Sequence, residues 1–136
     1  MPGLRTMTGF DELLVQDAVA AGEPRTLVTT RLLSACLGEG GEDRALAMTV
    51  GRRETLLLEL RRSAFGERIE AVTRCPRCGE ALDLDLVTGD LLLAAQDEAA
   101  AAEVEIEADD VGWRAVLRPV TGADQRAALD VQDPAA

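Results

Sequence analysis

The chain of 136 residues contains no histidine, lysine, asparagine or tyrosine, and aromatic residues make up only 2% of it. Without histidine there is no Ser-His-Asp or Cys-His catalytic arrangement, no imidazole acid–base catalysis and no histidine-ligated metal. The few aromatic side chains disfavour a stacking platform for single-stranded nucleic acid, and the formal net charge of −11 disfavours nucleic acid binding again. We therefore expect a protein that is not an enzyme and has no nucleic acid partner.

Long uninterrupted hydrophobic runs are also missing. No stretch approaches the roughly 20 apolar residues that span a bilayer. Near the N-terminus, the apolar run from Phe10 to Ala21 contains three acidic residues, so it does not fit the apolar region of an export signal. Three cysteines, an odd number, do not form the disulfide framework of a small secreted protein. We expect a cytoplasmic protein with no membrane partner.

Apolar residues nevertheless make up 47% of the chain, which is enough for a core. The length suits a single domain spanning residues 1–136. The period of the apolar positions predicts an α+β fold. Residues 1–66 are expected to be mainly helical, residues 67–120 to form two β-hairpins joined by an acidic Ala- and Leu-rich segment, and residues 121–136 to form a short helix and a frayed tail.

Two amphipathic helices are predicted before residue 40. The first spans residues 10–21 with Thr8 as its cap, and the second follows Pro24, ends at Gly38 and carries Cys36 on its apolar face. We interpret Cys36 as a small core residue. The glycine-rich run 38–43 is predicted to be a mobile loop. The apolar stripe of the first helix comprises Phe10, Leu13, Leu14, Ala18 and Ala21.

A third helix is predicted from Met48 to Phe65, with Thr49 as its cap and Gly66 as its end. Its apolar stripe comprises Leu56, Leu57, Leu60 and Ala64, and outside that stripe lie Arg52, Arg53, Arg61 and Arg62. These arginines form either a basic protein-binding face or an ordinary solvated surface. Residues 80–111 carry 11 acidic residues and no basic one, which indicates either solvated loop and strand faces or a second docking surface.

Period-two alternation predicts the two hairpins. The first strand of the first hairpin has an alternating pattern at Ile69, Ala71 and Thr73 and leads to a Cys-x-x-Cys turn. In the strand after the turn, aspartates alternate with Leu82, Leu84 and Leu86. In the second hairpin, Glu105 or Glu107 is expected to face Arg114 or Arg118 across the strands.

The pair Cys75 and Cys78, followed by Gly79, forms a knuckle of the kind that holds zinc. Two thiolates are half of a tetrahedral site, so a full site needs Cys36 and a carboxylate brought close, or ligands from a second chain. Three interpretations stay open: reduced thiols in a degenerate knuckle, a zinc ion shared with another subunit or partner, and a redox dithiol. The last is disfavoured because the pair lies between strands and not at a helix N-terminus.

The order of these elements resembles the baseplate hub assembly proteins of contractile-tailed phages and related contractile injection systems. The similarity rests on a helix that begins at Thr-Val-Gly (residues 49–51) and ends in Phe-Gly (65–66), on the Cys-Pro-Arg-Cys-Gly-Glu knuckle with its acidic alternating strand, and on Arg-Pro-Val-Thr-Gly-Ala-Asp at 118–124. It covers residues 46–126. The resemblance implies a chaperone-like role in joining baseplate or hub proteins, incorporation into a tail-like particle as one outcome, and no catalytic residues.

Two other functions fit the knuckle. A small zinc-ribbon-like adaptor or regulatory domain would bind stoichiometric zinc and would use Arg74 and Arg77 as a basic surface. A thiol oxidoreductase would require one cysteine with a low pKa.

Overall fold

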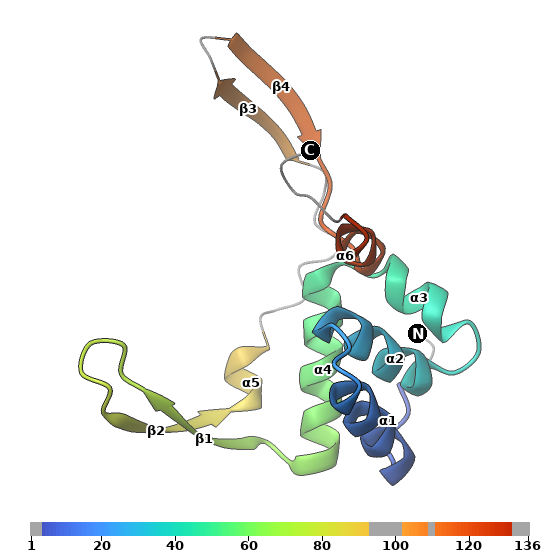
Figure 1. Ribbon diagram of the computed structural model, residues 1–136, viewed down its shortest axis with the longest axis vertical. Helices are drawn as coiled ribbons and strands as arrows, with labels where there is room; N and C mark the ends of the chain where they lie inside the picture. Colours follow the sequence, from blue (N-terminus) through green and yellow to red (C-terminus); the bar gives the residue numbers. More distant parts are fainter. Residues whose placement is uncertain (1–3, 93–101, 109–110, 132–136) are drawn as a thin grey trace.

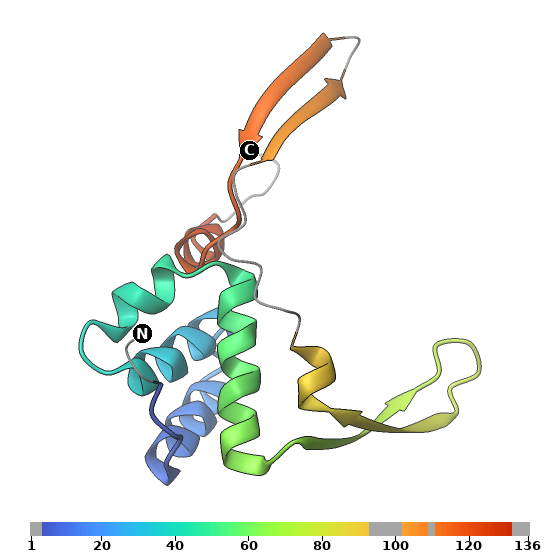
Figure 2. The ribbon, with the colours of Figure 1, turned by 180° about the vertical axis from the view of Figure 1, so that it is seen from behind.

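The computed structural model describes residues 4–92, 102–108 and 111–131. A body of helices carries two β-hairpins that project from it in different directions (Figures 1 and 2). The helices in the described part are α1 (Gly9–Ala20), α2 (Arg25–Leu37), α3 (Gly41–Ala47), α4 (Val50–Phe65), α5 (Thr88–Leu91) and α6 (Gly122–Leu129). The strands there are β1 (Arg68–Arg74), β2 (Ala81–Val87), β3 (Ala102–Ala108) and β4 (Val111–Leu117). The α+β prediction, with helices first and two hairpins after them, is confirmed.

The hydrophobic core lies where α2, α3 and α4 meet. Its buried members are aliphatic apart from one thiol: Leu33, Cys36, Leu37, Ala45, Leu56 and Leu60. Full burial of a leucine side chain contributes roughly 1.5–3 kcal/mol. The interpretation of Cys36 as a core residue is confirmed, and burial raises the pKa of its thiol. Ala64 was predicted to continue the stripe of α4 but is exposed, since it lies beyond the core at the end of the helix.

Helix α1 begins as predicted but turns a different face inward. Thr8 is the N-cap, and Thr8 and Asp11 form a capping box. Phe10 is 85% exposed and Leu13 is 54% exposed, so these two members of the predicted apolar stripe do not face the core. The buried positions of α1 are Asp11 and Ala18. The reason is an ion pair on the inner side of the helix, which holds Asp11 toward α2.

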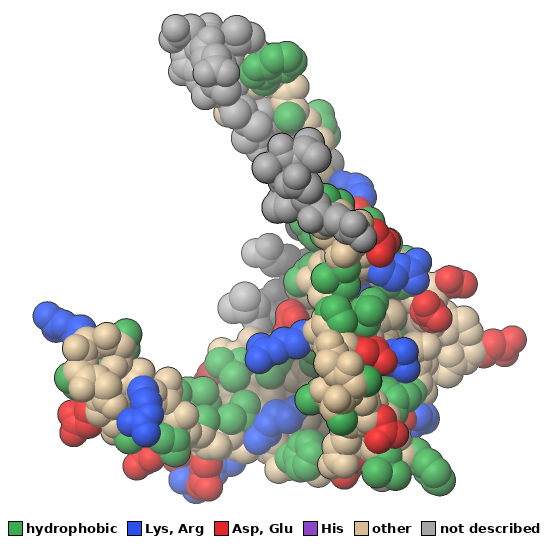
Figure 3. Space-filling model, in the orientation of Figure 1, with side chains coloured by type: hydrophobic (Ala, Val, Ile, Leu, Met, Phe, Trp, Pro, Cys, Tyr) green, Lys and Arg blue, Asp and Glu red, His purple; other side chains and the backbone are tan. Residues whose placement is uncertain are grey.

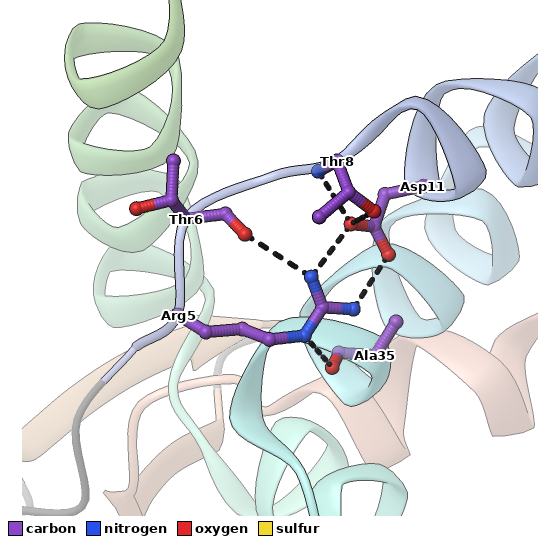
Figure 4. Close-up of polar contacts among 5 residues, drawn as sticks. All are labelled: Arg5, Thr6, Thr8, Asp11 and Ala35. Carbon is purple, nitrogen blue, oxygen red and sulfur yellow. Dashed lines mark hydrogen bonds and ion pairs between the residues drawn. The ribbon is translucent and has the colours of Figure 1, made fainter.

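That ion pair joins Arg5 and Asp11 (Figure 4). Two guanidinium nitrogens of Arg5 donate to the two carboxylate oxygens of Asp11, both at 2.7 Å, while Arg5 Nε donates to the carbonyl of Ala35 at 3.1 Å. Asp11 also accepts from the backbone N–H and the hydroxyl of Thr8, at 2.8 and 2.9 Å. The Arg5 guanidinium is the largest influence that holds the pKa of Asp11 well below its ordinary value. The pair fastens the chain before α1 to α2.

Helix α3 starts inside the run that was predicted to be a mobile loop, so that prediction is wrong for residues 41–43. Gly40 has a φ of +65°, a left-handed conformation, and Gly41 is buried. A Cβ on Gly41 would collide with the backbone carbonyl of Ser34 in α2. Gly40 therefore allows the left-handed turn before α3, and Gly41 allows the close approach of α3 to α2.

Helix α6 is locked to the start of α4. Thr49 and Thr121 form an antiparallel bridge, flanked by hydrogen bonds from Val50 N–H to the carbonyl of Val120 at 2.8 Å and from Gly122 N–H to the carbonyl of Met48 at 3.0 Å. Thr121 caps α6 with a capping box. The short C-terminal helix is confirmed, and the frayed tail predicted after it falls largely on residues 132–136, outside the described residues.

The second hairpin pairs β3 with β4 in antiparallel register. The predicted cross-strand ion pair is confirmed for one combination, because Arg114 and Glu105 are opposite each other and their side chains approach to 3.2 Å. The Ala- and Leu-rich segment at residues 90–102 was expected to be helical and partly loop-like, and its described ends are the last residues of α5, residue 92 and the first residue of β3. Its remainder, residues 93–101, lies outside the described residues.

Candidate functional site

The Cys-x-x-Cys turn stands at the tip of the β1–β2 hairpin, as predicted. Cys75 N–H donates to the carbonyl of Glu80, and Gly79 N–H donates to the carbonyl of Cys75, both at 2.8 Å. Gly79 has a φ of +74°, a left-handed conformation that suits glycine. We call residues 75–79 the knuckle. Its backbone is closed on itself by these hydrogen bonds, so it is a formed turn.

The two sulfur atoms of the knuckle belong to one local arrangement. The backbone N–H groups of Cys78 and Arg77, and then the thiol of Cys78, hydrogen-bond to the sulfur of Cys75 and lower its pKa. Cys75 is half-buried and Cys78 is exposed. Backbone N–H groups that converge on a cysteine sulfur favour its thiolate form, which is the form that binds metal.

The knuckle lacks further ligands in its own chain as far as the described residues go. Among them, no three His, Cys, Asp or Glu side chains gather closely enough to hold a metal ion. One of the two ways to complete the site used Cys36 and a carboxylate, and the structure argues against it because Cys36 is buried in the helical core. The tip of the β1–β2 hairpin lies well away from α2 in both views (Figures 1 and 2).

Basic side chains surround the knuckle. Arg74 Nη1 donates to the carbonyl of Gly79 at 3.1 Å, and Arg77 is exposed within the turn. Figure 3 shows a basic side chain at the outer end of this arm. Glu80 follows immediately as the nearest acidic residue in sequence.

The four arginines predicted as a protein-binding face do not share one role. Arg53 is 1% exposed, so its assignment to a surface is wrong. Its guanidinium donates to the carbonyls of Ala45 and Thr26, both at 3.1 Å, and to the hydroxyl of Thr30 at 2.8 Å. None of these acceptors is a carboxylate, and burial lowers the pKa of Arg53. The side chain joins α2, α3 and α4 from inside the body.

Arg61 also has a structural position. It donates to the carbonyls of Gly66 and Arg68, both at 2.6 Å, and to the hydroxyl of Thr88 at 3.3 Å. These contacts fasten the base of the first hairpin to α4. Arg62 is exposed and lies 3.7 Å from a carboxylate oxygen of Glu67, and Arg52 is half-buried. Of the four, Arg52 and Arg62 remain candidates for contact with a partner.

The first hairpin has one apolar and one charged face. The register pairs Ile69 with Leu86, Ala71 with Leu84 and Thr73 with Leu82, and we call these six residues the apolar face. Its three leucines remain 36–43% exposed. On the other face, both carboxylate oxygens of Asp85 accept from Arg68, at 2.9 and 2.6 Å. A two-stranded ribbon with a solvent-exposed apolar face is suited to pack against another surface.

Two arginine–aspartate pairs at helix starts share a sequence signal that apolar periodicity does not show. The pattern Arg-x-x-Thr-Gly-x-Asp occurs twice, at residues 5–11 and 118–124. In the second copy, Arg118 donates to both carboxylate oxygens of Asp124, at 2.6 and 2.7 Å, and Asp124 accepts from Thr121 N–H and hydroxyl. Both copies therefore build a capped helix start with an arginine clamp.

These features define an α+β protein with a helical body, two projecting hairpins and a two-thiol knuckle. No helix in the described ranges has the length and apolar character to cross a membrane. The T4 bacteriophage base plate protein family matches residues 4–132, and the chain belongs to this family. No curated protein and no solved structure matches the chain.

Proposed function

We propose that this protein has a non-catalytic, protein-binding role in assembling the baseplate hub of a phage tail or a related contractile injection system. The observation that carries the proposal is family membership over residues 4–132. The partners are then other baseplate or hub proteins, and the chain either leaves after assembly or stays in the particle.

The exposed surfaces support binding to proteins. The apolar face of the first hairpin holds three exposed leucines in a row, and Trp113 of the second hairpin is 63% exposed. Figure 3 shows hydrophobic side chains along both arms. Projecting arms with uncovered apolar side chains can reach a partner while the helical body stays folded.

A first experiment tags the protein in its native host, identifies the proteins purified with it, and tests finished particles for its presence. Hub proteins in the purified fraction, with this chain missing from particles, would support an assembly chaperone. Presence in both would support a structural baseplate part. Recovery of polymerase or ribosomal components in place of baseplate proteins would contradict the proposal.

A matched pair of variants locates the binding surface. Leu84→Lys places a charge on the apolar face, whereas Val72→Lys places the same charge on the opposite face, where Val72 is 70% exposed. We expect Leu84→Lys to reduce recovery of hub proteins and Val72→Lys to leave it unchanged. Equal recovery of hub proteins with both variants would exclude the apolar face as the binding surface. The double charge reversal Arg52→Glu and Arg62→Glu tests the remaining basic surface of α4 in the same assay.

A further inference from the structure

We propose that two copies of this chain bind one Zn²⁺ between their knuckles, with Cys75 and Cys78 of each copy completing a four-thiolate tetrahedral site. This inference goes beyond hub assembly and stands or falls independently of it. It rests on the sulfur donors, the ligand count, the position of the knuckle and the surrounding charge.

The donors are arranged for a metal. Both sulfurs lie on one turn, which is closed by the hydrogen bonds from Cys75 N–H to the carbonyl of Glu80 and from Gly79 N–H to the carbonyl of Cys75. Structural zinc takes four protein ligands, with Zn–S distances of about 2.3 Å and two cysteines separated by two residues as a common half-site. The knuckle supplies such a half-site.

The ligand count favours a second copy of the chain. The sequence has no histidine, and the described residues offer no third ligand near the knuckle. The third cysteine, Cys36, is closed inside the body. A second copy supplies an identical pair, and a two-fold axis through the metal gives each copy the same environment, which is the usual symmetry of a homodimer.

The position of the knuckle permits this pairing. Strands β1 and β2 have seven residues each. At 3.3 Å per residue, they place the knuckle about 23 Å from the base of the hairpin. The hairpin projects away from the helices (Figure 2). Two knuckles can therefore meet tip to tip while the helical bodies stay apart. The apolar faces of the two hairpins lie next to this junction.

Charge at the tip matches the expected complex. Four thiolates around Zn²⁺ carry a net charge of −2, and each copy places Arg74 and Arg77 beside the metal against a single acidic neighbour, Glu80. Arg74 is held over the turn by its hydrogen bond to the carbonyl of Gly79. The surplus of positive charge stabilises the anionic centre.

The test uses the full-length, reduced protein. We expect one zinc ion per two chains by elemental mass spectrometry and a dimer by light scattering, which becomes a monomer when a chelator removes the metal. Replacement of zinc by Co²⁺ should give the intense visible absorption of tetrahedral thiolate coordination. One zinc ion per monomeric chain, no zinc binding by the reduced protein, or a dimer unaffected by the chelator would each overturn the proposal.

Two variants provide the control. Cys78→Ser is expected to lose both zinc and dimer, while its circular dichroism shows intact helices because the knuckle lies outside the helical core. Cys36→Ala removes the third thiol and is expected to keep the stoichiometry and the dimer. Zinc uptake that requires Cys36, or that occurs only when another baseplate protein is added, would exclude pairing between two copies.

Discussion

The guanidinium of Arg53 fills the space directly beneath the backbone of Gly122. A Cβ built on Gly122 would collide with Nη1 of Arg53 and would approach the carbonyl of Ala45 to 2.9 Å. Arg53 thus joins α2, α3 and α4 through its hydrogen bonds and also forms the floor on which α6 begins. Arg53 and Gly122 are about 70 positions apart in the chain, and this contact fixes their relative positions in the fold.

Gly122→Ala should therefore destabilise the protein although its φ is not left-handed. We expect a loss of about 1–3 kcal/mol in the free energy of unfolding, the range typical of overpacking. Urea unfolding followed by circular dichroism measures it. Gly51→Ala is the control, because nothing lies within 4 Å of the added Cβ and alanine favours the helix. Equal stability of the two variants would contradict the packing argument.

The two arginine clamps should differ in strength. Asp11 is 3% exposed, whereas the side chain of Asp124 is 36% exposed. Asp11→Asn removes the charge from a buried carboxylate that accepts several hydrogen bonds, and we expect a loss of about 2 kcal/mol. Asp124→Asn is expected to cost less because solvent screens its ion pair. Urea midpoints of both variants test this order, and a larger loss for Asp124→Asn would contradict it.

Acid should weaken the fold through these same carboxylates. The arginine partners hold the pKa of Asp11 and Asp124 below the ordinary value of 3.8, so the unfolded chain takes up protons before the native state does. Their contribution is complete above that ordinary value and is lost as the pH falls below it. Unfolding midpoints measured from pH 6 to pH 2 should decline, and the decline should be shallower in the double variant Asp11→Asn, Asp124→Asn. If the unfolding midpoints of the double variant and the unaltered protein fell equally with pH, Asp11 and Asp124 would be excluded as the cause of the acid sensitivity.

Arg61 should control how firmly the first hairpin is attached. Arg61→Ala removes three hydrogen bonds at the base of the hairpin. If the free energy of local opening falls by about 1.4 kcal/mol, the hairpin base opens tenfold more often. Hydrogen exchange at the amide of Thr88, which donates to the carbonyl of Glu67 at 2.8 Å, reports this opening. Arg62→Ala removes only an exposed ion pair and should leave the exchange rate nearly unchanged. A similar acceleration in both variants would contradict the role given to Arg61.

Local patterns in the sequence determined most of the elements. Thr8, Thr49 and Thr121 mark three helix starts because an N-cap acts within three residues of itself. The alternation after residue 68 predicted the first hairpin and the place of the knuckle, because strand period and turn chemistry are also local. The resemblance carried by these motifs agrees with the base plate family.

Tertiary structure alone decided which side chains are buried. Arg53 resembled its half-buried neighbour Arg52 in sequence, but the meeting of three helices enclosed Arg53 and supplied three acceptors. Gly40 and Gly41 resembled a loop, but a helix starts there, with Gly40 in a left-handed conformation and Gly41 in close contact with Ser34 of α2. Phe10 fitted an apolar stripe, but with Asp11 turned inward to pair with Arg5, Phe10 and Leu13 are exposed and Ala18 of the same stripe is buried. A cap or a strand period is set by neighbours in the chain, whereas burial depends on which faces of distant elements meet.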